Sequence, residues 1–253
     1  GSEESVRALS PEDVRQWHRE RLLTARFAVG VVGDVIPADV ASIFARELGV
    51  LAGSRPSSVE LPVWPDAPIA RAESRDKAQT ALAIAFPGPG RTDPARHAAH
   101  LTATIASGLG GRFFDELRDR QSLAYTVHAH TSEHEVSGAF LSYIATSPEK
   151  EDIARQGLLR EFARFSDEPV APEELERAKK YTMGAHAIRQ ESGAAVLGEM
   201  LDAWMFGGGL GELAEHDALV EAVSADDIQL LARKYFDPAR RVEGIVRGMG
   251  RHV

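Results

Sequence analysis

Residues 108–130 read GLGGRFFDELRDRQSLAYTVHAH, and this stretch decides the fold. It opens with a glycine cluster. Apolar residues then recur at helical spacing from Phe113 to Leu117, and apolar residues alternate from Leu123 to Val127. Helical spacing predicts a short helix, and alternation predicts a strand. The stretch therefore predicts a loop, a short helix and a strand in succession.

Arg118 and Tyr125 lie near the two ends of the connection between this helix and this strand. If the chain doubles back there, the guanidinium and the phenol point into one space. Arginine offers a rigid fork of donors and tyrosine adds one more. Such a pair suits a peptide carbonyl, or the negative charge that develops on it during hydrolysis. The structural alternative places Arg118 in a surface salt bridge and leaves Tyr125 half-buried in a sheet.

Composition limits the classes of protein. The chain has 253 residues, of which 43% are hydrophobic, enough to build the core of one large or two small domains. The absence of cysteine excludes a disulfide framework and a thiolate metal site. A formal net charge of -9 without a basic patch argues against nucleic acid. No apolar run approaches the roughly 20 residues of a membrane span. We expect a soluble, bacterial protein of the cytoplasm or periplasm.

An internal repeat links the two ends of the chain. Ser10 (in ALSPEDV) matches Ser224 (in AVSADDI), and Gly30 matches Gly244, each 214 positions later with no gap between them. Serine followed by proline and acidic residues is typical of a helix N-terminus. The repeated unit is therefore predicted to be a helix that begins near Ser10, followed by a strand over residues 27–34.

This repeat predicts the domain organisation. Residues 1–5 are a tag scar or leader, with Gly1-Ser2 typical of a removed expression tag. Residues 6–52 are the closing helix–strand–helix unit of a preceding copy, whose strand would lack its natural sheet. The proline- and serine-rich residues 53–76 form an extended linker. Residues 77–253 are one complete copy.

Periodicity and breakers predict the elements of the complete copy. They are a strand (77–86), a helix (94–107), a hairpin (122–130 and 136–145), a helix (147–165), a long helix bent near Ser192 (172–205), two short helices (212–221 and 224–236) and a strand (241–248). This order lacks the strict alternation of a doubly wound sheet. We therefore expect an α+β fold, a mostly antiparallel sheet with helices packed on one face.

The glycine-rich turn, the aromatic-Leu-Arg helix and the Leu-Ala-Tyr strand resemble the non-catalytic half-domain of the pitrilysin family. The family includes insulin-degrading enzyme and the mitochondrial processing peptidase. The resemblance implies two tandem half-domains of similar fold that enclose an unfolded peptide, the first half bearing zinc. It also implies that Arg118 anchors the substrate backbone and that Tyr125 donates to the carbonyl or its oxyanion.

His130-Thr-Ser-Glu-His134 matches the inverted zinc motif H-x-x-E-H, the signature of the catalytic half of this same family. The motif works on a helix, because side chains four apart then stand on one face. Here it lies between two predicted strands, on the hairpin loop. The helix at the catalytic position, residues 94–107, holds His97 and His100 but lacks the motif.

These observations favour a chain that binds no metal, with the zinc in a catalytic half or partner. His130, Glu133 and His134 remain a weaker metal candidate, with Glu191 or Glu199 as a remote third ligand.

Three functions are compatible with the sequence. The leading hypothesis is a substrate-binding half of a zinc metalloendopeptidase, inactive by itself, whose partners are a peptide and a zinc-bearing half-domain or subunit. The second is a structural or assembly subunit, because the family fold also serves as inactive core subunits of larger complexes. The third is a metallohydrolase that uses the His130–His134 motif.

Overall fold

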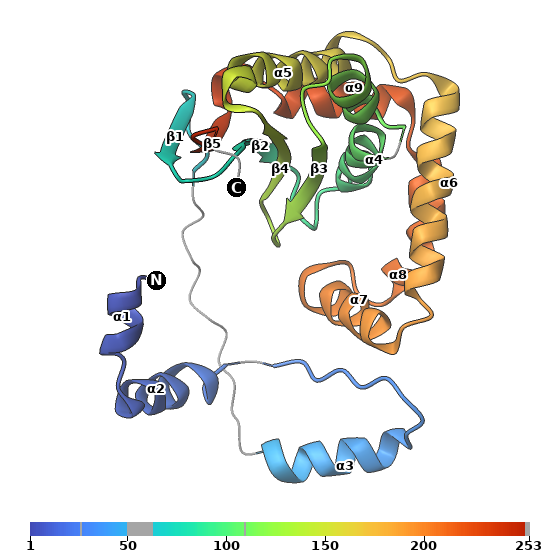
Figure 1. Cartoon of the computed structure of the whole chain (residues 1–253). Helices are drawn as coiled ribbons and strands as arrows, with labels where there is room; N and C mark the ends of the chain where they lie inside the picture. The colour runs from blue at the N-terminus through green and yellow to red at the C-terminus, as the bar shows by residue number, and fades with distance from the viewer. Residues whose placement is uncertain (26, 50–62, 109, 251–253) are drawn as a thin grey trace. The chain divides into compact units, whose positions relative to one another are not determined.

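The structure is a computed structural model that divides into two compact units, each described by itself (Figure 1). It describes residues 1–25, 27–49, 63–108 and 110–250.

The N-terminal unit comprises residues 1–62 together with residues 193–201. Its helices are α1 (Glu3–Ala8), α2 (Pro11–Trp17), the π-helix η1 (His18–Leu22), α3 (Pro37–Leu48) and the first part of α7 (Gly193–Phe206). Helix α1 forms in the segment expected to be a leader. None of the helices from α1 to α3 buries a residue. These helices therefore depend on local features, their caps and the spacing of their residues, more than on burial in a core.

Residues 27–34 form no strand, so the strand predicted there is wrong. They have no regular secondary structure and pass close to α7: a Cβ on Gly30 would stand 2.5 Å from Cδ1 of Leu197. The described part of this unit contains no strand at all. An isolated strand cannot satisfy its backbone N–H and C=O groups by pairing, so sequence alternation alone does not produce a sheet.

The C-terminal unit holds every strand that the structure describes. Its elements are β1 (Ile69–Ser74), β2 (Thr80–Gly88), α4 (Arg96–Ser107), the π-helix η2 (Phe114–Arg120), β3 (Thr126–Glu133), β4 (Gly138–Thr146), the 3-10 helix η3 (Pro148–Lys150), α5 (Glu151–Asp167), α6 (Pro172–Arg189), the end of α7, α8 (Gly211–Ala222), α9 (Ala225–Tyr235), the 3-10 helix η4 (Pro238–Arg240) and β5 (Val242–Arg247).

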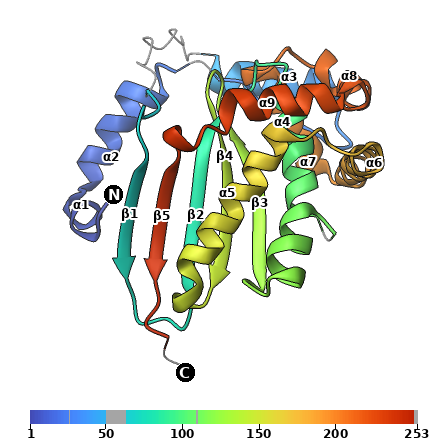
Figure 2. The ribbon, with the colours of Figure 1, turned by 90° about the horizontal axis from the view of Figure 1, so that it is seen from above.

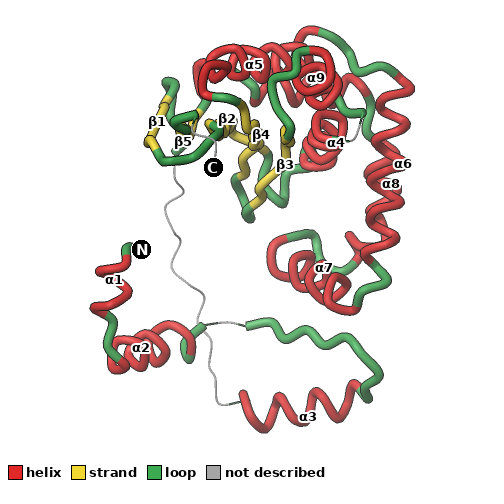
Figure 3. The backbone as a smooth tube through the Cα atoms, viewed as in Figure 1, coloured by secondary structure: helices red, strands yellow, loops and turns green. Residues whose placement is uncertain are grey.

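The five strands form one sheet in the order β1-β5-β2-β4-β3. Strand β1 pairs parallel with β5, and the other three neighbouring pairs are antiparallel. Helices α5 and α9 lie across one face of this sheet, and α4 packs beside β3 (Figure 2). The expected α+β fold is confirmed. The tube in Figure 3 shows the strands gathered in one sheet.

Aromatic rings fill the space between the sheet and its helices. Phe86 of β2 and Phe140 of β4 contact Phe162 of α5 and Phe236, with ring centroids 4.9 to 5.8 Å apart and mostly edge-to-face. Such tilted pairs are favoured over face-to-face stacks. Alternate residues of β2, such as Ala83, leave the opposite face of the sheet lined with small side chains and partly open.

Three expected boundaries differ from the structure. Residues 69–74 of the expected linker form β1, because the closing strand β5 offers them a parallel partner. The predicted long helix is two helices, interrupted at residues 190–192 rather than bent. The second strand of the hairpin lies near its predicted position, but the first begins at Thr126 and not at residue 122. None of the described helices is both long and apolar enough to span a bilayer.

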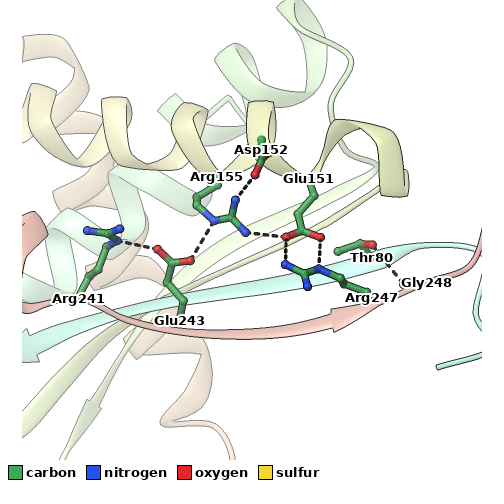
Figure 4. A network of polar contacts seen from close by, with 8 residues as sticks. All are labelled: Thr80, Glu151, Asp152, Arg155, Arg241, Glu243, Arg247 and Gly248. Atoms are coloured by element: carbon green, nitrogen blue, oxygen red, sulfur yellow. Dashed lines mark hydrogen bonds and ion pairs between the residues drawn. The ribbon is translucent and has the colours of Figure 1, made fainter. Parts of the chain in front are cut away.

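An ion network fixes β5 to α5 (Figure 4). Arg155 of α5 donates to Glu151 at 2.7 Å and to the buried Glu243 of β5 at 2.9 Å. Arg247 of β5 donates twice to the same Glu151 carboxylate, at 2.9 and 3.0 Å. These hydrogen bonds, led by that of Arg247, hold the pKa of Glu151 below its usual range. The closing strand is therefore held by charge pairing as well as by its two neighbouring strands.

Candidate functional site

A glycine turn begins the site. Gly110 has φ +83°, a left-handed conformation that side chains disfavour. A Cβ on Gly111 would stand 2.7 Å from the carbonyl oxygen of Ile105, so this position has no room for a side chain. Gly110 and Gly111 therefore lead tightly into the π-helix η2, which carries Arg118.

A tight turn after η2 reverses the chain. Ser122 takes a left-handed φ of 50°, and its N–H donates to the carbonyl of Arg118 at 3.0 Å. Leu117 and Leu123, on the two sides of the turn, are both buried in the core. The hydroxyl of Thr146 donates to the carbonyl of Leu123 at 2.6 Å. Buried leucines and this hydrogen bond therefore fix where Arg118 and the following Tyr125 lie.

The reversal brings Arg118 and Tyr125 together. The Arg118 guanidinium carbon lies 4.9 Å from the centre of the Tyr125 ring and 4.2 Å from that of Phe114. Cations stack favourably on aromatic faces at such distances. The contact with Phe114, four residues earlier on η2, was not predicted, although the i, i+4 spacing in the sequence could have shown it. The guanidinium therefore stacks on two rings.

Both groups of the pair remain open to solvent. The Tyr125 residue is 77% exposed, and the Arg118 side chain is 33% exposed. The nearest carboxylate to Arg118 is that of Asp119, at 4.0 Å, which is long for an ion pair. Within the described ranges, no hydrogen bond ties the Tyr125 hydroxyl. The Nζ of Lys150 donates to the Ser122 carbonyl at 3.0 Å nearby, beside a shallow pocket of about 160 Å³ that Tyr125 also lines.

This arrangement can bind an acceptor-rich ligand. A stacked guanidinium loses little freedom when it forms further hydrogen bonds, because its plane is already set. A carbonyl or a carboxylate above the pair would find charge-assisted donors. The chemistry that these two side chains offer is binding and charge stabilisation.

The H-x-x-E-H motif takes a different geometry from the one expected. Residues 130–133 belong to β3, and only His134 lies in the turn that follows. The His130 ring lies 6.0 Å from that of His128 on the open face of the sheet. The Glu133 carboxylate points to the other face, 2.5 Å from Nε2 of His100. Since alternate strand residues face opposite sides, the strand keeps His130 and Glu133 apart.

His97 and His100 lie on α4, as predicted. His97 is buried, and burial is the main cause that lowers its pKa to about 4. Its ring is therefore neutral at physiological pH. The His100 ring contacts the His97 ring edge-on, with centroids 6.4 Å apart, and its Nε2 pairs with Glu133, which links α4 to β3.

The chain belongs to the peptidase M16 inactive domain family, whose sequence profile matches residues 8–182. It is 23% identical to an uncharacterized zinc protease of Streptomyces coelicolor over 246 residues, covering 92% of this chain and 52% of that protein. It is 27% identical to one of Mycobacterium leprae over 253 residues, with coverages of 93% and 55%. The chain thus spans about half the length of these relatives.

Solved structures show the same fold. A peptidase M16 inactive domain from Pseudomonas fluorescens superimposes with a TM-score of 0.85 at 21% identity, covering 98% of this chain and 60% of that chain. A chain of Complex III2 from Candida albicans gives a TM-score of 0.85 at 16% identity, with coverages of 97% and 61%. The resemblance to the non-catalytic half-domain of a zinc metallopeptidase family is confirmed.

Proposed function

We propose that this chain is the substrate-binding half of a zinc metalloendopeptidase, which positions an unfolded peptide for cleavage by a zinc-bearing half or partner. The observation that carries the proposal is the stacked Arg118–Tyr125 pair, which is open to solvent and whose recorded ion pair among the described residues is the long 4.0 Å contact with Asp119. The zinc-bearing half in this proposal is inferred from the relatives, which are named zinc proteases and are about twice as long as the part that this chain matches.

Each residue has a defined role in this proposal. Arg118 binds a peptide carbonyl through the guanidinium fork, and Tyr125 donates its hydroxyl to the same carbonyl or to the oxyanion that forms from it. Phe114 holds the guanidinium plane. Zinc, the attacking water and the general base belong to the other half, where a bound zinc ion polarises the carbonyl and activates water.

Peptide binding by the purified chain tests this role. A fluorescently labelled unfolded peptide is titrated with wild-type chain and with Arg118→Ala, and anisotropy is measured. Loss of a charge-assisted hydrogen bond is expected to weaken binding by about 1.5–3 kcal/mol. Tyr125→Phe, which removes only the hydroxyl, is expected to weaken it less.

Arg120→Ala is the matched control, because Arg120 lies on the same π-helix and pairs with Glu116 at the surface. It is expected to bind the peptide as the wild type does. If Arg118→Ala, Tyr125→Phe and Arg120→Ala all bind equally, the pair has no role in recognition. If the wild-type chain and its complex with the zinc-bearing half bind no peptide, the structural-subunit alternative replaces the proposal.

A further inference from the structure

A cluster of metal-ligand side chains lies away from the Arg118–Tyr125 pair and from the H-x-x-E-H motif. It consists of His186 of α6 with His216 and Asp217 of α8, all in the C-terminal unit. One ring nitrogen of each histidine and one carboxylate oxygen lie within 4.8 Å of one another. Across the described part of the chain, this is the one group of three or more histidine or acidic side chains with such spacing.

The ligand atoms nearly have the spacing that a metal ion requires. The Oδ1 atom of Asp217 lies 2.9 Å from Nδ1 of His216 and 3.8 Å from Nδ1 of His186. A tetrahedral ion with bonds of 2.0–2.2 Å separates its ligands by about 3.3–3.6 Å. The two observed separations lie on either side of that range. Small shifts of the side chains would bring all three atoms to one ion.

The imidazoles are already in contact. The rings of His186 and His216 stack with centroids 3.8 Å apart and planes inclined by 26°. Two imidazolium ions in this position would repel, whereas a shared cation is compatible with two neutral rings. The lone pairs of stacked rings run side by side, so binding has to turn the rings toward the ion. The second side-chain torsion of histidine is broad and permits that turn.

The surroundings suit a partly enclosed site. The side chains of His186 and His216 are 13% and 21% exposed, while that of Asp217 is 66% exposed and leaves an entry for the ion. The side-chain amide of Gln190 lies 3.1 Å from Nε2 of His186. Metal-bound histidines usually engage their second ring nitrogen in such a hydrogen bond, which sets the tautomer and the ring orientation. The amide can present its oxygen after a flip.

Helix packing holds the cluster together. Helices α4, α6 and α8 contact one another pairwise, and four of the nine histidines of the chain lie on them: His97, His100, His186 and His216. The buried Nδ1 atom of His97 has no hydrogen-bond partner among the described residues. His97 also lies within electrostatic range of His216. The ligands thus lie on two helices, α6 and α8, that contact each other and α4, and not on a loop.

We propose that His186, His216 and Asp217 bind one divalent transition-metal ion, with a fourth position open to water. Two imidazoles and a carboxylate suit Zn²⁺, and Ni²⁺ and Cu²⁺ compete for the same donors. The ion links α6 to α8. The proposal revises the sequence-based expectation that the chain binds no metal. It does not depend on the proposed peptide-binding role, because the two sites share no residue.

Zinc titration of the purified, tag-free chain tests the site. The chain is stripped with a chelator, dialysed, and titrated with Zn²⁺ by calorimetry. We expect about one equivalent to bind, and at least about a tenfold weaker Kd in His186→Ala and in His216→Ala. Asp217→Asn is expected to weaken binding less, because the amide oxygen can still coordinate. Titration with Co²⁺ is expected to give the intense visible absorption of tetrahedral coordination.

His130→Ala/His134→Ala is the matched control, because it removes two exposed histidines of the other motif. It is expected to bind zinc as the wild type does. Circular dichroism checks that each variant folds, and His186→Gln and His216→Gln replace any alanine variant that does not. Uptake below about a tenth of an equivalent overturns the proposal. So does uptake that survives in both His186 and His216 variants, or that the hairpin double variant abolishes.

Discussion

Two segments with a matching sequence pattern, residues 8–34 and 222–248, which we call the two copies of the repeat, do not share a structure. In both, a serine and an aspartate cap the helix with the same hydrogen-bond lengths: 2.8, 2.6 and 3.2 Å for Ser10 with Asp13, and for Ser224 with Asp227. The following residues then diverge. Residues 242–247 form β5 inside the sheet, whereas residues 27–34 form no strand.

The two copies differ because a helix cap depends on local sequence, whereas a strand depends on tertiary partners. A capping box needs only four consecutive residues, so it forms wherever its sequence occurs. A strand needs partners, and β5 has one on each side, β1 and β2. Helix α9 also buries Ile228 and Leu231, whereas α2 and η1 bury nothing. The copy beside a sheet and a core therefore completes the unit, and the other copy keeps only its helix.

The largest expected effect follows from the ion network of the second copy. The double variant Arg155→Met/Arg241→Met leaves the buried carboxylate of Glu243 without either of its guanidinium partners, and breaking a buried pair costs about 3–5 kcal/mol. In the first copy, Arg19 pairs with Glu12 at the surface, so Arg19→Ala is expected to change stability by less than about 1 kcal/mol. Denaturant unfolding of both variants measures this contrast. Equal losses would show that β5 does not depend on the network.

The next largest loss of stability is expected at two apolar positions that correspond in the repeat. Ile245 of β5 is 5% exposed, and Val31, its counterpart in the repeat, is 41% exposed. Ile245→Ala is expected to cost about 2–5 kcal/mol, because it removes buried methyl groups and leaves a cavity. Val31→Ala is expected to cost well under about 1.5 kcal/mol, because little of that side chain is removed from water. Urea midpoints compare the two. A Val31→Ala loss as large as that of Ile245→Ala would mean that residues 27–34 are packed in solution.

The helix caps should be equivalent. Ser10→Ala and Ser224→Ala each remove one capping hydrogen bond, which typically costs about 1 kcal/mol. Amide hydrogen exchange of α2 and α9 reports the loss helix by helix. The Ser224 change should also lower the free energy of unfolding of the C-terminal unit, since α9 packs on its core. An effect of Ser10→Ala on that unit would contradict the separation of the two copies.

Lowering the pH should destabilise both helix caps, and this is the smallest expected effect. Hydrogen bonds from Ser10 and from Ser224 lower the pKa of Asp13 and of Asp227 below the ordinary 3.8. Because the folded pKa is the lower one, each contribution is complete above pH 3.8 and is lost as the pH falls through the folded value. Carboxyl-carbon NMR titration measures both. An ordinary pKa at Asp13 alone would show that only the second cap is formed.

The sequence predicted most of the second unit, because its elements carry strong local signals. The glycine run after Phe206 ends α7 as expected, and the hairpin, α4, α5, α8, α9 and β5 lie near their predicted positions. Strand β1 could not be predicted, because its partner β5 lies about 170 residues away in the sequence. The sequence placed Arg118 and Tyr125 near each other, but the stacking of Arg118 on Phe114 was not predicted, although the two residues are four apart on one helix.

By itself, the sequence determined the features that a few consecutive residues control. These are the two capping boxes, the helix periodicity, the glycine turn at residues 110–111 and the family resemblance. Tertiary structure decided what depends on distant partners: which copy of the repeat becomes a strand, which face of β3 receives His130, and that His186 meets Asp217. The physical reason is that a cap satisfies its own hydrogen bonds, whereas a strand or a ligand cluster needs atoms supplied by other segments.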